Sequence, residues 1–160
     1  MARRDTTIYL LAAGLGAIAG MRSMAAPALL SHQLAQRPRW WPRTTIEQML
    51  STETASRVLK VLAAGEMVVD KVPGIPDRID LPFLAGRALS GALTGAALAS
   101  YERRRTIPVA LVSTLSAVGA TYAMFYTRRF GSHRFLREPY LGFLEDGIAV
   151  GAGLRLLRRV

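Results

Sequence analysis

One long stretch without charge does most to limit what this chain can fold into. Residues Thr106 to Thr127 contain no Asp, Glu, Lys or Arg, and about 20 apolar residues in a helix cross the ~30 Å hydrocarbon core of a bilayer. Two further apolar runs each contain a single arginine: Leu81 to Tyr101 contains Arg87, and Thr6 to Leu34 contains Arg22. A domain of 160 residues has little polar surface with which to cover three such runs. The sequence therefore predicts an integral membrane protein.

The charged residues support the same prediction. Lys and Arg total 21 against 11 Asp and Glu, which gives a net charge of +10. The arginines cluster where the apolar runs end, at positions 3–4, 37–43, 103–105, 128–129 and 158–159. This placement is typical of a chain that contacts the bilayer and its anionic headgroups, and it argues against nucleic-acid binding. With no cysteine and only His32 and His133, we expect no metal and no cofactor.

We expect one all-α membrane domain over residues 1–160, with about five short, glycine-rich helices that span the membrane or are partly re-entrant. Their expected ranges are 8–34, 55–72, 81–101, 107–127 and 140–157. In the first range Arg22 and Pro27 interrupt the apolar pattern, because proline removes a backbone hydrogen bond. That range is either one kinked span or a broken, partly re-entrant segment. A cleaved signal peptide is the alternative for the N-terminus, and apolar residues continuing to Leu30 favour a retained helix.

The orientation depends on which segments cross fully. Five simple crossings would nearly balance the basic residues of alternate loops, so the positive-inside rule would give no orientation. If the first or last segment is re-entrant, the loop around Trp40 and the loop 103–105 share a side, opposite the acidic turn around Asp77 and Asp80. We favour that arrangement over a protein that inserts in both orientations.

Charged residues inside or at the ends of the apolar segments are the candidate site. They are Arg22, Glu66, Asp70, Arg87, Glu145 and Asp146. Each costs about 2.5–3.5 kcal/mol at the centre of a membrane helix, so unpaired charges would be hard to retain. Glu66 and Asp70 are four residues apart on one helix face, and Arg22 and Arg87 are their natural partners. These charges either line a pathway for an ion or polar substrate, or form a structural clamp; those near helix ends can also extend to the interface.

The glycines predict close helix packing. Gly16 with Gly20, and Gly91 with Gly95, have the GxxxG spacing that lets helix backbones approach, and Gly86 extends the second set. No glycine run has the setting of a phosphate-binding loop, and no serine–histidine arrangement indicates a nucleophile. We therefore assign no catalytic residue.

Several short motifs together resemble a known family. They are Gly20-Met21-Arg22, Asp70-Lys71-Val72-Pro73-Gly74, Ala85-Gly86, and Pro139 followed by Leu144-Glu145-Asp146. In order and approximate spacing they are similar to the small bacterial membrane proteins grouped as domain of unknown function 4126. The Asp-Lys-x-Pro-Gly and Leu-Glu-Asp elements are the most specific, whereas the loops around Trp40 and 128–137 fit less well. The resemblance implies a multi-pass protein of the bacterial inner membrane, and it implies no activity.

Three functions are compatible with these features. We expect a small oligomeric channel or transporter for an ion or small charged solute, because charges and broken helices are features of membrane transport sites. The alternative is an accessory, structural or lipid-contacting subunit of a larger membrane complex. A membrane enzyme acting on lipid would have to use Glu66 and Asp70 as acid and base, without a metal or histidine nearby.

Overall fold

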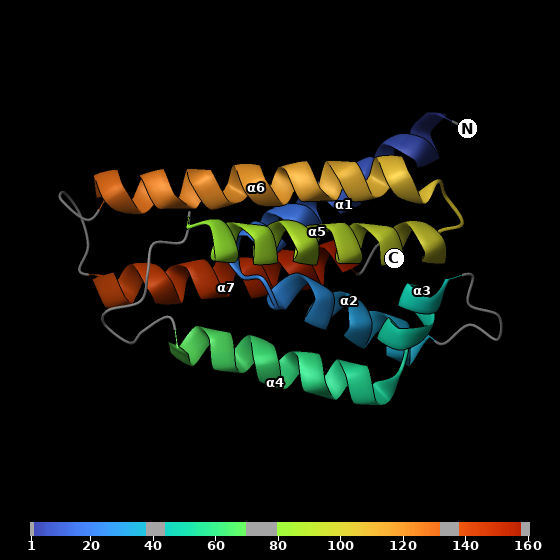
Figure 1. The fold of residues 1–160 in the computed structure, drawn as a ribbon, viewed down its shortest axis with the longest axis horizontal. Coiled ribbons are helices and arrows are strands. Elements are labelled where there is room, and N and C mark those ends of the chain that lie inside the picture. Colours follow the sequence, from blue (N-terminus) through green and yellow to red (C-terminus); the bar gives the residue numbers. More distant parts are fainter. Residues whose placement is uncertain (1, 38–43, 70–79, 132–137, 158–160) are drawn as a thin grey trace.

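A computed structural model describes residues 2–37, 44–69, 80–131 and 138–157, with side chains described in these ranges except at 2–5, 128–131 and 138–146. Within them every regular element is a helix, so the all-α prediction is confirmed (Figure 1). The helices are α1 (Ala2–Met21), α2 (Ala25–Gln36), α3 (Thr45–Leu50), α4 (Glu53–Val69), α5 (Leu81–Tyr101), α6 (Thr106–Gly131) and α7 (Glu138–Leu157).

The helices differ from the expected ranges chiefly in two places, and α4, α6 and α7 differ by a few residues at their ends. The range 8–34 is divided between α1 and α2, so the broken form of the two alternatives is the one observed. The short helix α3 lies in the polar piece between residues 36 and 54, where the sequence analysis placed no helix. The hydroxyl of Thr44 accepts a hydrogen bond from the backbone N–H of Glu47 at 3.2 Å and begins this helix. The signal was present as Thr-x-x-Glu, the capping-box pattern.

Helix α6 lies at the centre of the closest packing, between α1 and α5. A Cβ atom added at Gly16 would lie 2.1 Å from the carbonyl oxygen of Ser113, and one added at Gly20 would lie 2.1 Å from that of Ala117. On the α5 side, a Cβ at Gly95 would lie 2.6 Å from the Cβ of Ser113. Only glycine permits backbones to approach this closely. Both glycine pairs, Gly16 with Gly20 and Gly91 with Gly95, therefore pack against α6.

Helices α1 and α2 form a hairpin that enters and leaves the bundle at the same end (Figure 1). Helix α1 runs parallel to α6, since Gly16 lies against Ser113 and Gly20 against Ala117. The chain then turns, and α2 runs back. Midway along α2, the hydroxyl of Ser31 donates to the carbonyl of Leu50 at the end of α3, at 2.6 Å. The hairpin is therefore re-entrant with respect to the bundle, while α4, α5, α6 and α7 run between its two ends.

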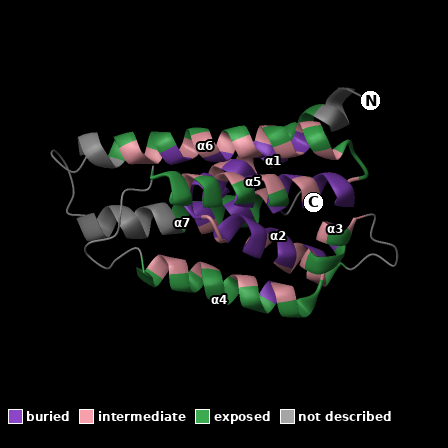
Figure 2. Cartoon of the chain, in the orientation of Figure 1, coloured by how far each residue is buried: buried purple, intermediate pink, exposed green. Residues whose placement is uncertain are grey.

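Two of the described helices are long and apolar enough to cross a membrane: α5 over its whole length, and α6 over Thr106–Thr127. The apolar part of α1, Thr6–Met21, and that of α7, Gly147–Leu157, are shorter. Most of the buried side chains lie in α1, α2 and the second half of α5 (Figure 2). Helix α4 contrasts with them, because Ser56 is its one buried residue.

The buried hydroxyl of Ser113 gives a first testable prediction. It is fully buried and, within the described part of the chain, its oxygen has no hydrogen-bond partner. Removing an unsatisfied buried polar atom relieves a desolvation cost. We expect Ser113→Ala to leave the free energy of unfolding unchanged or to raise it by up to about 1 kcal/mol. The matched variant Ser116→Ala removes a 2.6 Å hydrogen bond to the carbonyl of Ala13 and should lower the free energy of unfolding. Unfolding of both variants in mixed micelles measures the difference, and a larger loss for Ser113→Ala would contradict the prediction.

Candidate functional site at the break between α1 and α2

The break occupies Arg22, Ser23 and Met24, between the last residue of α1 and the first of α2. The amide of Arg22 still bonds to the carbonyl of Ile18 at 2.8 Å, and the helix ends there. Pro27 lies in the first turn of α2, where a missing N–H costs no intrahelical bond. A helix end inside a protein leaves carbonyls of one helix and amides of the next without intrahelical partners. At this break, other helices supply those partners.

The carbonyls at the end of α1 accept hydrogen bonds from α5 and α6. The guanidinium of Arg87 donates to the carbonyl of Gly20 at 3.0 Å, and the hydroxyl of Thr121 donates to the same oxygen at 3.1 Å. The hydroxyl of Ser90 donates to the carbonyl of Ser23. Arg87, Ser90 and Thr121 are all buried. These donors satisfy backbone oxygens at the end of the helix, so α5 and α6 stabilise the break.

The amides at the start of α2 are bound by a carboxylate from α4. One oxygen of Glu66 accepts from the backbone N–H of Ser23 at 2.9 Å and from its hydroxyl at 2.7 Å. The other oxygen accepts from the N–H of Met24 at 2.8 Å. Met24 is the N-cap residue of α2, and its own side chain forms no capping hydrogen bond. Glu66 therefore caps a helix to which it does not belong, with a negative charge at the positive end of the helix dipole.

The structure brings three of the six candidate charges together at this break. Arg22 is 1% exposed and lies within it, Arg87 is 3% exposed and bonds to α1, and Glu66 bonds to Ser23 and Met24. The pairing of Glu66 with an arginine stays a prediction, and the carboxylate accepts hydrogen bonds from Ser23 and Met24. Asp70 lies outside the described residues. Glu145 and Asp146 lie in α7, and their side chains are not among those described.

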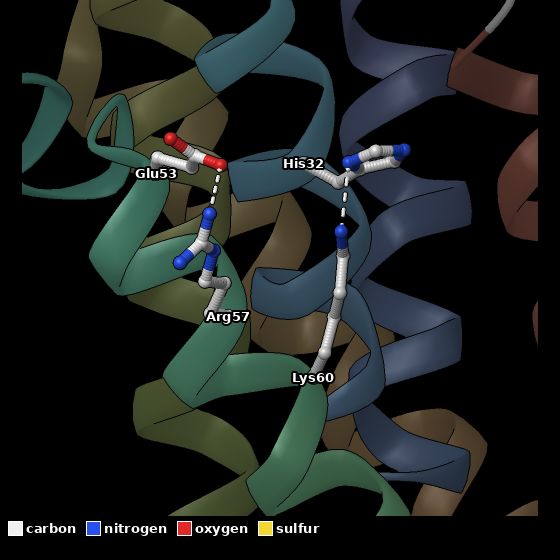
Figure 3. Close-up of polar contacts among 4 residues, drawn as sticks. All are labelled: His32, Glu53, Arg57 and Lys60. Atoms are coloured by element: carbon white, nitrogen blue, oxygen red, sulfur yellow. Dashed lines mark hydrogen bonds and ion pairs between the residues drawn. The ribbon is translucent and has the colours of Figure 1, made fainter.

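A second polar contact joins α4 to the hairpin. The ammonium of Lys60 in α4 lies 2.9 Å from Nδ1 of His32 in α2 (Figure 3). Because an ammonium can only donate, Nδ1 of His32 must accept in this contact. The neighbouring pair of Glu53 and Arg57, 2.5 Å apart, lies within α4 and is exposed, so it does not connect α4 to another helix. Helix α4 is thus attached to α2 by polar contacts at Lys60 and Glu66.

A buried carboxylate that the sequence analysis missed lies at the end of the bundle where α3 meets α5. Glu47 is 1% exposed and accepts a hydrogen bond from the hydroxyl of Ser100 at 2.5 Å. The hydroxyl of Thr44 donates to the same serine oxygen at 3.1 Å. These bonds attach α3 to the last turn of α5. Ser23, Ser90 and Thr121 were also missed as partners of the break, because hydroxyls in apolar helices carry no sequence signal of their own.

Gly86 was expected to contribute to close helix packing, and the structure does not place it against another described helix. It is exposed, and an added Cβ would meet no described atom within 4 Å. It therefore takes no part in helix packing within the described chain, unlike Gly16, Gly20, Gly91 and Gly95. No group of three or more His, Asp and Glu in the described ranges is placed to hold a metal ion.

The fold and the site together define a class of protein: an all-α bundle around a broken helical hairpin, with buried arginines and a capping carboxylate at the break. The chain belongs to the family described as Domain of unknown function (DUF4126), whose model matches residues 9–156. The resemblance seen in the sequence motifs is thereby confirmed. Searches of curated proteins and of solved structures found no match to this chain.

Proposed function

We propose that the chain is a multi-pass protein of the bacterial inner membrane and forms a small oligomeric channel or transporter for an ion or small charged solute. The observation that carries the proposal is the helical hairpin whose break lies inside the bundle beside the buried Arg22 and Arg87. Discontinuous helices of this kind build substrate sites in transporters, because their ends present backbone groups and dipoles to a solute. In a bilayer, non-helical backbone is tolerated only inside protein or along a water-filled cavity.

The weak attachment of α4 fits such a role. Its described contacts with the rest of the bundle are chiefly with α2, and they include the polar contacts of Glu66 and Lys60. An element that is held by few buried contacts opens at low free-energy cost. Displacement of α4 would uncover the amides of Ser23 and Met24. Exposed apolar residues on the first half of α5, such as Leu81 and Leu89, offer a face for lipid or for another protomer.

Flux through reconstituted protein tests the proposal. We expect purified protein in liposomes to conduct at least one member of a panel of small ions and charged solutes, and Arg87→Ala to change the rate at least severalfold, since the variant removes a buried positive charge from the break. Arg57→Ala is the matched control, because that arginine is exposed on α4. Arg87→Lys retains the charge if Arg87→Ala does not fold. Flux equal to that of empty liposomes for every solute would refute the proposal.

The second candidate is an accessory subunit of a larger membrane complex. The hydrogen bonds at the break favour this role if they are structural. The carbonyls of Gly20 and Ser23 and the carboxylate of Glu66 already have partners within the chain, so they can stabilise the fold without binding a solute. Gentle detergent extraction, native gel separation and mass spectrometry distinguish the two functions. A discrete homo-oligomer supports the channel or transporter, and co-migration with larger unrelated subunits supports the accessory role.

A further inference from the structure

We infer that the end of the bundle where the α1–α2 hairpin opens is its cytoplasmic end, so that the chain has both termini and its arginine-rich connections on that side. This inference concerns orientation and rests on the proposed membrane location, not on transport. It follows from the helix directions, from the charge at the two ends of the bundle, and from one backbone conformation.

The helix directions place particular connections at the same end. Helix α2 leads to α3, which is attached to the last turn of α5 through Thr44 and Ser100. Residues 36–54 and the α5–α6 connection at 102–105 therefore share an end, which we call the arginine end. Helix α1 starts and α7 finishes there too, because Gly14 of α1 lies against Leu156 of α7 (Figure 1). The α4–α5 and α6–α7 connections lie at the opposite end.

The two ends differ in charge. In the sequence, the basic residues of the segments at the arginine end are Arg3, Arg4, Arg37, Arg39, Arg43, Arg103, Arg104, Arg105, Arg158 and Arg159. Those of the segments at the opposite end are Lys71, Arg78, Arg128, Arg129, Arg134 and Arg137. In the sequence, the segments of the arginine end also contain Asp5, Glu47, Glu53 and Glu102, and those of the opposite end contain Asp70, Asp77, Asp80 and Glu138. Ten basic and four acidic residues give +6 for the arginine end, and six basic and four acidic residues give +2 for the opposite end. Five simple crossings would divide the arginine-rich segments between the two sides, whereas the re-entrant hairpin gathers them on one. Such an excess of Lys and Arg marks the cytoplasmic side and complements its anionic lipid headgroups.

The backbone conformation of the turn after α5 supports a role in orientation for the positive charge of Arg103. Arg103 has a φ of 56°, a left-handed conformation that usually carries glycine at the end of a helix. An arginine there costs about 1 kcal/mol relative to glycine. Its side chain is exposed, as are those of Arg104 and Arg105. A side chain at a strained, exposed position adds nothing to the core, so its contribution is the charge that it presents at this end.

The same helix directions give the depth of the break within the span. Arg87 follows the start of α5 by six residues, about 9 Å along the helix axis. The whole of α5 is 21 residues, about 31 Å. Ser90, whose hydroxyl donates to the carbonyl of Ser23, follows the start of α5 by nine residues, about 14 Å. Gly20 lies against Ala117, which is midway along the apolar part of α6. The break therefore lies near the middle of the span, and the hairpin's open end faces the cytoplasm.

Single-cysteine labelling tests this orientation cleanly, because the chain has no cysteine of its own. Exposed positions serve at each end: Thr6, Gln48 and Arg105 at the arginine end, and Asp80 and Thr127 at the opposite end. Each becomes cysteine in the full chain, and a membrane-impermeant maleimide is applied to spheroplasts and to inside-out vesicles. We expect T6C, Q48C and R105C to react only in inside-out vesicles, and D80C and T127C only in spheroplasts.

Each other pattern overturns a stated part of the inference. Labelling of T6C and Q48C from opposite sides would show that α1 and α2 form a continuous crossing, and the hairpin topology would be wrong. The reversed pattern would refute the cytoplasmic assignment, and equal labelling from both sides would show dual insertion. Recovery of the chain outside the membrane fraction would refute both this inference and the proposed function. The expected labelling together with no flux would refute transport alone.

A charge variant supplies a second measurement. We expect R103Q/R104Q to let a measurable fraction of T127C react in inside-out vesicles, because two positive charges are removed from the arginine end. The control is E53Q/R57Q, which alters two exposed residues of opposite charge within α4, leaves the net charge unchanged and should leave the labelling pattern unchanged. An unchanged pattern in R103Q/R104Q would show that these arginines do not determine the orientation.

Discussion

Replacing Gly16 or Gly20 by alanine should be among the most damaging single changes in this protein. A Cβ atom at either position would lie 2.1 Å from a backbone carbonyl oxygen of α6. A flexible side chain could rotate away, but a helix backbone cannot, so α1 must separate from α6. Overpacking costs typically 1–3 kcal/mol and occasionally more. We expect each variant to lose about 3 kcal/mol of unfolding free energy in mixed micelles.

The matched control is Gly119→Ala on α6 itself. Gly119 is exposed, and an added Cβ would meet no described atom within 4 Å. Alanine in a helix is more stable than glycine by up to about 1 kcal/mol, so this variant should be neutral or stabilised. A loss at Gly119 equal to the loss at Gly16 would show that glycine content, rather than the α1–α6 contact, accounts for the effect.

Replacing Glu66 by glutamine should destabilise the break between α1 and α2. The carboxylate accepts three hydrogen bonds, two of them from backbone amides. Glutamine has one acceptor oxygen and places an NH₂ group against a remaining N–H. Hydrogen bonds to charged groups contribute about 1.5–3 kcal/mol each, and Glu66 is only partly buried. We expect a loss of about 2–3 kcal/mol in unfolding free energy. Amide exchange at Ser23 and Met24 should become faster than in the native chain.

The control for Glu66→Gln is Glu53→Gln on the same helix. Glu53 is exposed and pairs with Arg57 in the same helix. An exposed i,i+4 pair contributes about 0.3–0.5 kcal/mol, so the control should change little. Hydrogen exchange resolves the location of the effect, since only the Glu66 variant should expose the start of α2. Unchanged exchange at Ser23 and Met24 in Glu66→Gln would contradict the capping role.

The helices that could be predicted are those with continuous apolar runs. Helix α5 begins at Leu81 and ends at Tyr101, the limits expected from the sequence, because Asp80 and Glu102 flank the run. Helix α3 could not be predicted because it is six residues long and follows a polar stretch, and only its Thr-x-x-Glu start marks it. The expected first helix was ambiguous, since Arg22 and Pro27 are compatible with a kink or a break.

Part of the candidate site could also be predicted. A charge inside an apolar segment needs a partner within the protein, and on that ground Arg22, Glu66 and Arg87 were selected. Their partners could not be predicted in the same way. Glu66 accepts from the amides of Ser23 and Met24, and Arg87 donates to the carbonyl of Gly20. Backbone groups become available as partners only where a helix ends, and the position of that end depends on packing.

The helical class, the apolar runs and the two buried arginines, Arg22 and Arg87, could be inferred from residue type and local periodicity alone, whereas the buried Glu47 could not. Three features appear only in the folded chain: α1 and α2 fold back as a hairpin, α6 contacts the glycines of both α1 and α5, and the arginine-rich segments share an end. The direction of a helix and the helices that it contacts depend on packing between residues that are far apart in the chain. Gly20 and Ala117, which touch in the bundle, carry no local signal that identifies them as neighbours.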